Sequence, residues 1–300
     1  FTMKKPIIGI ILDNEESGEY SKFPWYAIRQ NYLHSIELCG GIPMPLFHSE
    51  AIVLRSINLS EADKLVTFMT NRYGKVKCIA KAARKIKNRF GATIEPLSHI
   101  QLIYFGKENQ TLYRLNHSDI IHSFQDIRDD LQKIYTGIYF SELIDTLIPE
   151  MHPDPNAFRL LQDSLKTLEV VASLDVLSRA FEMRLMCFAG YTPQLSYCVI
   201  CKKSEYTTKI GFSFERRGIV CEPCTFQAQP EIRFQAGTLK YLKKLKTMDI
   251  KHANRLKFPK GIELEIEQLI HRFILSYTGR ELKSYPFIKS MAKIDTSIKL

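Results

Sequence analysis

The spacing of hydrophobic residues changes along this chain near residue 123. Before that point apolar residues come in short runs bounded by Gly, Asn or Asp, a pattern typical of β-strands. The runs predicted to be strands are AIVLRSI, DKLVTFMT, GKVKCIAKAA, ATIEPLSHIQLIYFG and QTLYRLN, which lie between residues 51 and 116. Five strands in about 70 residues favour a barrel of the OB type, a fold that often binds single strands of nucleic acid.

After residue 123 the apolar residues recur at helical spacing, which predicts the core of a helical bundle. The predicted helices are 126–148, a segment capped by Asn156, 175–189, 236–248 and 262–277. Pro149 ends the first helix and Gly190 ends the third. The chain is therefore predicted to be an α+β protein, with a barrel followed by a helical domain.

The first 48 residues have a different pattern. Residues 6–12 (PIIGIIL) predict a buried strand, residues 25–39 predict a helix, and IPMPLF predicts a returning strand. Together they form one β-α-β unit, but a lone parallel pair of strands cannot cover both of its faces. We therefore expect residues 1–48 to be a truncated β-α-β segment joined to the rest of the chain.

Two Cys-x-x-Cys pairs predict a metal site. They are Cys198 with Cys201 and Cys221 with Cys224, and 19 residues separate the pairs. Four thiolates at this spacing favour a closed, structural zinc site with no position left for water or substrate. Two disulfides or a dithiol redox centre are the alternatives. The intervening KIGFSFERRGIVC predicts a hairpin that brings the second pair back to the first.

Clustered positive charge predicts a polyanionic partner, most often nucleic acid. The formal net charge is +10, and residues 72–89 carry no acidic residue. The cations of this stretch are Arg72, Lys75, Lys77, Lys81, Arg84, Lys85, Lys87 and Arg89. Alternation along GKVKCIAKAA predicts one inward face and one face of mostly lysine. Tyr73 and Phe90 flank the run, either to stack on bases or to fill the barrel core. A second basic cluster spans residues 240–260, where the alternative is an ordinary solvated face.

Other classes of function find little support in the sequence. No apolar run reaches the roughly 18 residues of a membrane span, and the first residues lack a signal-peptide cleavage site. We therefore expect a cytoplasmic, nucleoid-associated protein without membrane contact, whose thiols stay reduced. No carboxylate pair, phosphate-binding Gly-rich loop or Ser/His constellation is recognisable, so we expect no enzymatic activity.

Two resemblances to known families extend these expectations. KKPIIGIILD and YSKFPWYAIRQNYLHSIELCGGIPMPLF resemble the start of class I glutamine amidotransferase-like hydrolases of the γ-glutamyl-γ-aminobutyrate group. Nothing after residue 48 continues that pattern, so no catalytic residue is carried over. From about residue 50 to 290 the chain resembles the RecO family of bacterial recombination mediators. The motifs are AIVLRSINLSEADKLVTFMTNRYGKV, YFSELIDTLIPEMHPDPNAFRLLQDSLKTL, SRAFEMRLMCFAGYTPQLSYCVICKK and YTGRELKS.

The RecO resemblance implies a function and a set of partners. It implies binding of single- and double-stranded DNA, annealing of complementary strands, and help in loading recombinase together with RecR and single-strand-binding protein. The RecO resemblance implies an OB domain 49–122, a helical domain 123–197 and 229–300, and an inserted zinc module 198–228. The other resemblance adds an amidotransferase-like fragment 1–48. Two alternatives are an amidotransferase-like hydrolase, which needs a nucleophilic Cys and a downstream His, and an RNA-binding zinc protein.

Overall fold

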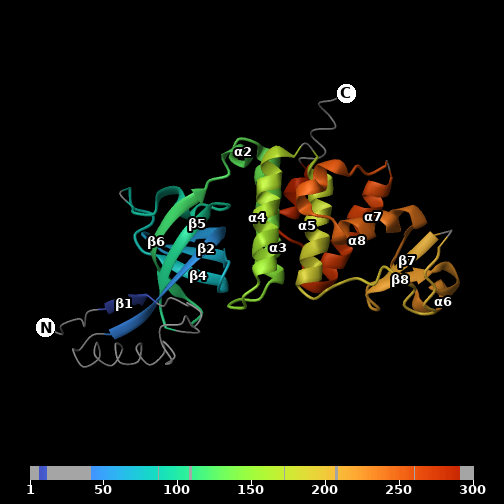
Figure 1. Ribbon diagram of the computed structural model, residues 1–300, viewed down its shortest axis with the longest axis horizontal. Coiled ribbons are helices and arrows are strands. Elements are labelled where there is room, and N and C mark those ends of the chain that lie inside the picture. Colours follow the sequence, from blue (N-terminus) through green and yellow to red (C-terminus); the bar gives the residue numbers. More distant parts are fainter. Residues whose placement is uncertain are drawn as a thin grey trace, which may run out of the picture. The chain divides into compact units, whose positions relative to one another are not determined.

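The strands of the N-terminal unit pair into one sheet that closes on itself. The computed structural model, shown in Figure 1, describes residues 7–11, 42–86, 88–107, 110–171, 173–206, 209–259 and 261–290. Its two compact units are Phe1–His122 and Ser123–Leu300. The strands of the first unit are β1 (Ile7–Ile11), β2 (Ile42–Asn58), β3 (Lys64–Thr70), β4 (Gly74–Ala80), β5 (His99–Phe105) and β6 (Tyr113–His122). The 3-10 helix η1 (Gly91–Ile94) precedes β5.

The long strand β2 closes the sheet because it pairs with two neighbours. Residues 46–52 of β2 pair with β5, and residues 51–58 pair with β3, both antiparallel. The register shifts between Val53 and Arg55. Such a bulge bends a strand, so the two halves of β2 face different partners. With the pairs β3–β4, β4–β6 and β5–β6, the contacts form a ring of five strands.

The inside of this ring is apolar. Its fully buried side chains include Val66, Phe68, Cys78, Ile100, Leu102 and Leu115, which share one face of the sheet by strand pairing. The order of five strands predicted between residues 51 and 116 is confirmed, although β6 extends to His122, further than expected. Cys78 lies in this core as a small apolar residue, and burial raises the pKa of its thiol.

The strand β1 adds to the edge of β2 in parallel. Ile7 pairs with Ile42 and Ile11 pairs with Leu46. The two strands predicted for the first 48 residues are therefore present and parallel, while the predicted helix 25–39 lies outside the described residues. The boundary expected at residue 48 falls inside β2, because Leu46, Phe47 and His48 already pair with β5. Sequence patterns placed the break there, but hydrogen bonding continues through it.

Helices form the second unit together with a small sheet. The helices are α2 (Gln125–Arg128), α3 (Leu131–Leu147), α4 (Pro155–Val170), α5 (Leu174–Phe188), α6 (Thr225–Ala228), α7 (Ala236–Thr247) and α8 (Ile262–Thr278), with the 3-10 helices η2 (Glu222–Cys224) and η3 (Ile250–Arg255). The sheet has the strand order β8-β7-β9, from β7 (Lys209–Ser213), β8 (Gly218–Cys221) and β9 (Ile232–Gln235). Figure 1 shows this sheet and α6 at one edge of the unit.

Capping residues decide where two of these helices begin. The predicted helix 126–148 is two helices, because the Asp130 carboxylate accepts hydrogen bonds from the backbone N–H groups of Gln132 and Lys133 and starts α3. Asp154, not Asn156, caps α4 and accepts from the N–H of Ala157 at 2.9 Å. Proline at the first helical position suits that start, because its ring presets a helical φ.

A buried ion pair of α5 is hydrogen-bonded to α3. Within α5, Arg179 Nη2 lies 2.8 Å from Glu182 Oε1. The Tyr139 hydroxyl of α3 donates to the same oxygen at 2.6 Å. Arg179 is 5% and Glu182 is 1% exposed. Burial raises the pKa of Glu182 to about 7, although Arg179 and Tyr139 act in the opposite direction. Glu267 of α8 adds a nearby like charge that raises it further.

Candidate metal centre and nucleic-acid interface

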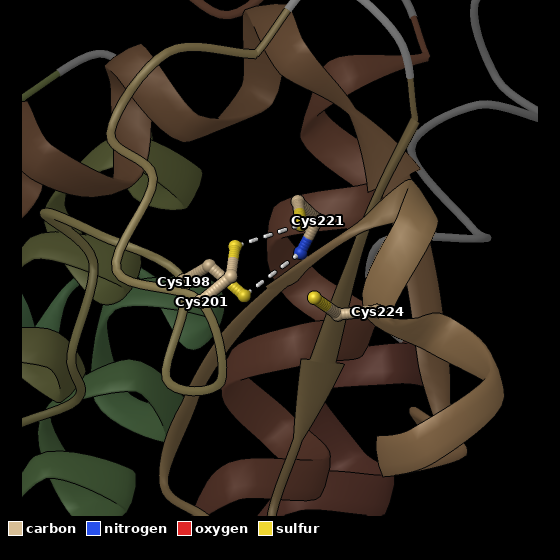
Figure 2. A group of neighbouring side chains, drawn as sticks. All are labelled: Cys198, Cys201, Cys221 and Cys224. Carbon is tan, nitrogen blue, oxygen red and sulfur yellow. Dashed lines mark hydrogen bonds between the residues drawn. The ribbon is translucent and has the colours of Figure 1, made fainter.

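The four cysteines come together from two short turns, as Figure 2 shows. Cys198 and Cys201 lie on the turn that follows α5, while Cys221 ends β8 and Cys224 ends η2. The β7–β8 hairpin pairs antiparallel from Ile210–Cys221 to Ser213–Gly218, and so returns the second pair to the first. Their sulfur atoms all lie within 4.8 Å of one another. Among the described residues, this is the one group of three or more His, Cys, Asp or Glu side chains arranged to hold a metal.

The spacing of these sulfur atoms fits a metal better than disulfides. Sγ of Cys201 and Sγ of Cys221 are 3.5 Å apart, and all four thiols are free. A disulfide requires about 2.05 Å between sulfurs. A regular tetrahedron with Zn–S bonds of about 2.3 Å places its sulfurs about 3.8 Å apart. The observed group therefore needs only small shifts to close around a metal ion.

The protonation of these thiols also fits a cation. Burial raises the pKa of Cys198, but backbone N–H donors, with that of Cys221 first, outweigh it and lower the pKa to about 6. For Cys224, burial and then the neighbouring thiols raise the pKa to about 12. Four adjacent thiolates repel one another, so all four ionise together only when a cation balances their charge.

Apolar side chains pack against three of the four cysteines, while Cys201 is exposed. Val220 is buried beside Cys198 and Cys221, and Val199, Ile200, Tyr206 and Ala228 pack against the group. The third strand, β9, pairs with β7, so the sheet of this module extends to Gln235, beyond the expected boundary at residue 228. Four sulfur ligands in an apolar setting suit a metal that holds the turns together.

The basic run of residues 72–89 is spread along β4 and the loop after it. Arg72 lies in the turn before β4, and Arg84, Lys85 and Arg89 lie in the loop that follows it. Seven strand residues at about 3.3 Å each separate the two groups by about 20 Å. Arg72, Lys81, Arg84, Lys85 and Arg89 are exposed, Lys77 is half-buried, and Lys87 lies outside the described residues. The structure thus arranges the cations as a line.

The first part of that loop is fixed to the turn between β2 and β3. Lys81 Nζ pairs with Asp63 Oδ2 at 2.7 Å, and the same carboxylate accepts from the N–H of Ala82. The hydrogen bond from Lys81 is the main cause that lowers the pKa of Asp63. Arg84 donates through Nη1 to the Ser60 carbonyl at 2.6 Å. Lys81 and Arg84 therefore hold the loop in place as well as adding charge to its surface.

The structure corrects one sequence expectation for this region and decides between two alternatives for Phe90. Lys75 is only 5% exposed, so the predicted lysine face does not begin at that residue. Alternation assigns a side chain to one face of a strand but does not show what else covers that face. Phe90 is 2% exposed and fills the core, so it is not available to stack on a base. The Tyr73 ring is half-buried, and its centroid lies 5.3 Å from that of the Phe47 ring in a T-shaped arrangement.

Arg114 joins this basic surface although its sequence position gave no sign of it. It lies on β6 and pairs in parallel register with Ile79 of β4. Because paired residues of neighbouring strands share a face, exposed Arg114 lies on the same outward face as Lys77 and Lys81. Arg89 reaches the same strand by donating to the Leu115 carbonyl at 3.4 Å. A single basic residue in a short strand carries no signal until the pairing is known.

Comparison with known proteins identifies the family. The family model described as recombination protein O, N terminal, matches residues 44–124, and the model for its C terminal part matches residues 128–286. The chain belongs to the RecO family. A DNA repair protein RecO of Symbiobacterium thermophilum is 32% identical over 251 residues, which cover 83% of this chain and 98% of that protein. The RecO protein of Desulfatibacillum aliphaticivorans is 32% identical over 255 residues, covering 83% and 99%.

Membership of the RecO family places this chain among DNA repair proteins. The RecO matches begin at residue 44, so the amidotransferase resemblance of residues 1–48 receives no support from them. The boundary of the RecO N-terminal match also agrees with β2 being one continuous strand from Ile42. Within the part of the chain that the structure describes, no helix has the length and apolar character needed to cross a bilayer.

Proposed function

We propose that this RecO-family chain is a recombination mediator that binds single- and double-stranded DNA and anneals complementary strands. It would help to load recombinase together with RecR and single-strand-binding protein. The observation that supports this most is the line of cations formed by exposed Arg72 before β4, half-buried Lys77 on it and the exposed cations of the loop after it, on a chain of a DNA repair family. Lysine and arginine on such a surface contact phosphates and release counterions, which favours binding of any sequence.

The ring of five strands supports this proposal, since it has the strand number and closure of an OB-type barrel. The proposed DNA contacts are Arg72, Lys77, Lys81, Arg84, Lys85, Lys87, Arg89 and, as an addition from the structure, Arg114. Lys75 is left out because it is buried. Annealing needs the protein to hold and align backbones and to leave base edges free to pair, so the mechanism requires no bond cleavage.

The cysteine group has a structural part in this proposal. Cys198, Cys201, Cys221 and Cys224 would hold Zn²⁺ through four thiolates. Such a site leaves no open position for substrate, so it stabilises the turns of the module and adds no catalytic step. We also propose three functional parts: a DNA-binding unit up to residue 122, the helical unit, and the zinc module within it.

An annealing assay tests this function. Complementary oligonucleotides labelled with a donor and an acceptor dye are coated with single-strand-binding protein and mixed with or without this protein. We expect annealing to be at least tenfold faster with the protein, and unlabelled DNA to compete. Equal annealing rates with and without it, over a range of protein concentrations, would contradict the proposal. Competition by RNA at much lower concentration than DNA would favour the RNA-binding alternative.

A further inference from the structure

A second set of cations lies on one face of α7 in the helical unit. Leu239, Leu242 and Leu245 of this helix are buried. Lys240, Lys243 and Lys244 are exposed. At 100° per residue these lysines are centred opposite the buried leucines, so they point away from the bundle. Arg255 and Lys257, at and just after the end of η3, are exposed as well.

The helix α7 itself carries no opposing charge. The sequence of α7, AGTLKYLKKLKT, contains four lysines and no acidic residue. Lys240 and Lys244 are four residues apart, and Lys243 and Lys246 are three residues apart. Side chains at these spacings are neighbours on a helix, so their like charges destabilise it. Lys244 and Lys246 gain some compensation from the helix dipole because they lie in the last turn. Lys251 of η3 differs, since it pairs with Asp163 at 3.3 Å.

The chemistry of this face favours a phosphate backbone over a protein partner. Protein interfaces have an apolar core inside a polar rim, whereas nucleic-acid interfaces are polar and strongly positive. Among the described residues, none of the exposed large hydrophobic side chains lies between residues 236 and 259. The face offers lysines without an apolar anchor, which suits a ligand held by its charges alone.

We propose that Lys240, Lys243 and Lys244 of α7 form a second site for a nucleic-acid backbone, separate in sequence and in structural unit from the β4 surface. This inference rests on the proposed function, because it gives one molecule two sites for two strands. A protein with both sites occupied brings complementary strands together without first releasing either. The second site is sequence-independent, since it contacts phosphates and no base edges.

The test measures whether one protein holds two strands that are unable to pair. Two oligothymidine strands of about 15 nucleotides, one with a donor dye and one with an acceptor, are added to the full chain. Energy transfer between them reports their joint binding. The variant K240A/K243A/K244A is compared with the control K166A/K209A/K283A, which removes three exposed lysines of the same unit and the same net charge. Sedimentation selects a protein concentration at which each complex contains one copy.

We expect the α7 variant to bind the first strand within about twofold of wild type and to lose at least tenfold in affinity for the second strand. Its melting temperature should equal or exceed that of wild type, because alanine favours the helix and the like charges are gone. The control variant should retain energy transfer.

Four results would overturn this inference. Energy transfer in the α7 variant equal to that of the control would exclude the face as a site. Wild-type protein that binds one strand without energy transfer would also exclude it, while the proposed function would stand. Wild-type protein that binds no strand would contradict both the second site and the proposed function. In a parallel arm with polyglutamate, a loss of polyglutamate binding without any loss of DNA binding would assign the face to an acidic protein instead.

Discussion

At the scale of single residues, the four cysteines lead to a testable prediction about metal binding. Replacing Cys198 or Cys224 by serine removes one of four ligands whose sulfurs lie within 4.8 Å of one another. We expect the purified protein to hold about one Zn²⁺, and each variant to lose it together with several kcal/mol of stability. Metal analysis of reduced protein and chemical denaturation measure both effects.

Cys187 provides the matched control for this experiment. It is half-buried at the end of α5 and is not part of the cysteine group. Cys187→Ser should therefore keep the metal and most of the stability. Freshly prepared wild-type protein that contains no metal under reducing conditions would show that the four thiols have another role.

The buried Glu182 carboxyl predicts how stability depends on pH. Burial raises its pKa from 4.5 to about 7, so between these values the folded protein binds more protons than the unfolded chain. The stabilisation from this group is complete below about pH 4.5 and is lost as the pH rises to about 7. At about 1.4 kcal/mol per pKa unit, the loss is on the order of 3 kcal/mol.

Denaturation of wild type and Glu182→Gln at several pH values between 4.5 and 7.5 isolates this contribution. Gln keeps an oxygen that accepts from the Tyr139 hydroxyl but does not titrate. His271 also titrates, with a pKa that burial lowers, and it acts in the opposite sense in both proteins. We expect the stability difference between the two proteins to change with pH in favour of wild type at low pH. A constant difference would contradict the raised pKa.

At the scale of secondary-structure elements, we expect the loop after β4 to contribute most to DNA affinity. Binding to single strands weakens with salt, with a slope of about −0.7 in log affinity against log salt for each phosphate contact. Replacing Arg84, Lys85 and Lys87 by alanine should therefore reduce the slope by about 2, alike for unrelated sequences. Stability should fall by about 1 kcal/mol, since Arg84 loses its hydrogen bond to the Ser60 carbonyl.

Affinity measured between about 50 and 300 mM salt tests this loop. The variant K166A/K209A/K283A serves again as the control with equal loss of charge, because its lysines lie in the helical unit. Its slope should stay close to that of wild type. If the loop variant keeps the wild-type slope, the DNA contacts lie elsewhere, and Arg72 and Arg114 are the next residues to replace.

Helices and strands differ in how well their limits follow from sequence. The hairpin β7–β8 and the helices α5, α7 and α8 lie within one or two residues of their predicted limits. The helical spacing of Leu and Phe and the position of Gly190 were enough to place α5 from the sequence. In the structure Gly190 has a φ of 86°, a conformation that favours glycine after a helix. The break before α3 was missed, because Asp130 has to adopt an extended backbone before its carboxylate caps a helix. Strand β9 was missed because four residues show no clear period.

At the scale of the whole molecule, the prediction concerns the first residues. Deleting 1–43 removes β1 but keeps the β2 residues that pair with β5. We expect this protein to retain its fold and its DNA binding. Deleting 1–48 also removes Phe47, whose ring contacts Tyr73, Tyr104 and Tyr113 at 5.1 to 5.5 Å. Losing these ring contacts should lower the free energy of unfolding by about 2 to 4 kcal/mol.

Thermal unfolding and salt-dependent DNA binding of both deletions check this expectation. Equal stability of the two truncated proteins would mean that residues 44–48 contribute little to the sheet. A folded 1–43 deletion that no longer binds DNA would instead assign a working part in binding to the first residues.

The sequence alone determined the order of the five strands of the first unit, the positions of α5, α7 and α8, the pairing of the cysteines into one group, and the resemblance to the RecO family. These depend on local periods and spacings, which any stretch of chain displays by itself. Tertiary structure decided the closure of the sheet through the bulge of β2, the burial of Lys75, and the meeting of Arg114 with the β4 surface. It also decided which α7 residues face outward. Such facts depend on contacts between residues far apart in sequence, which no local pattern specifies.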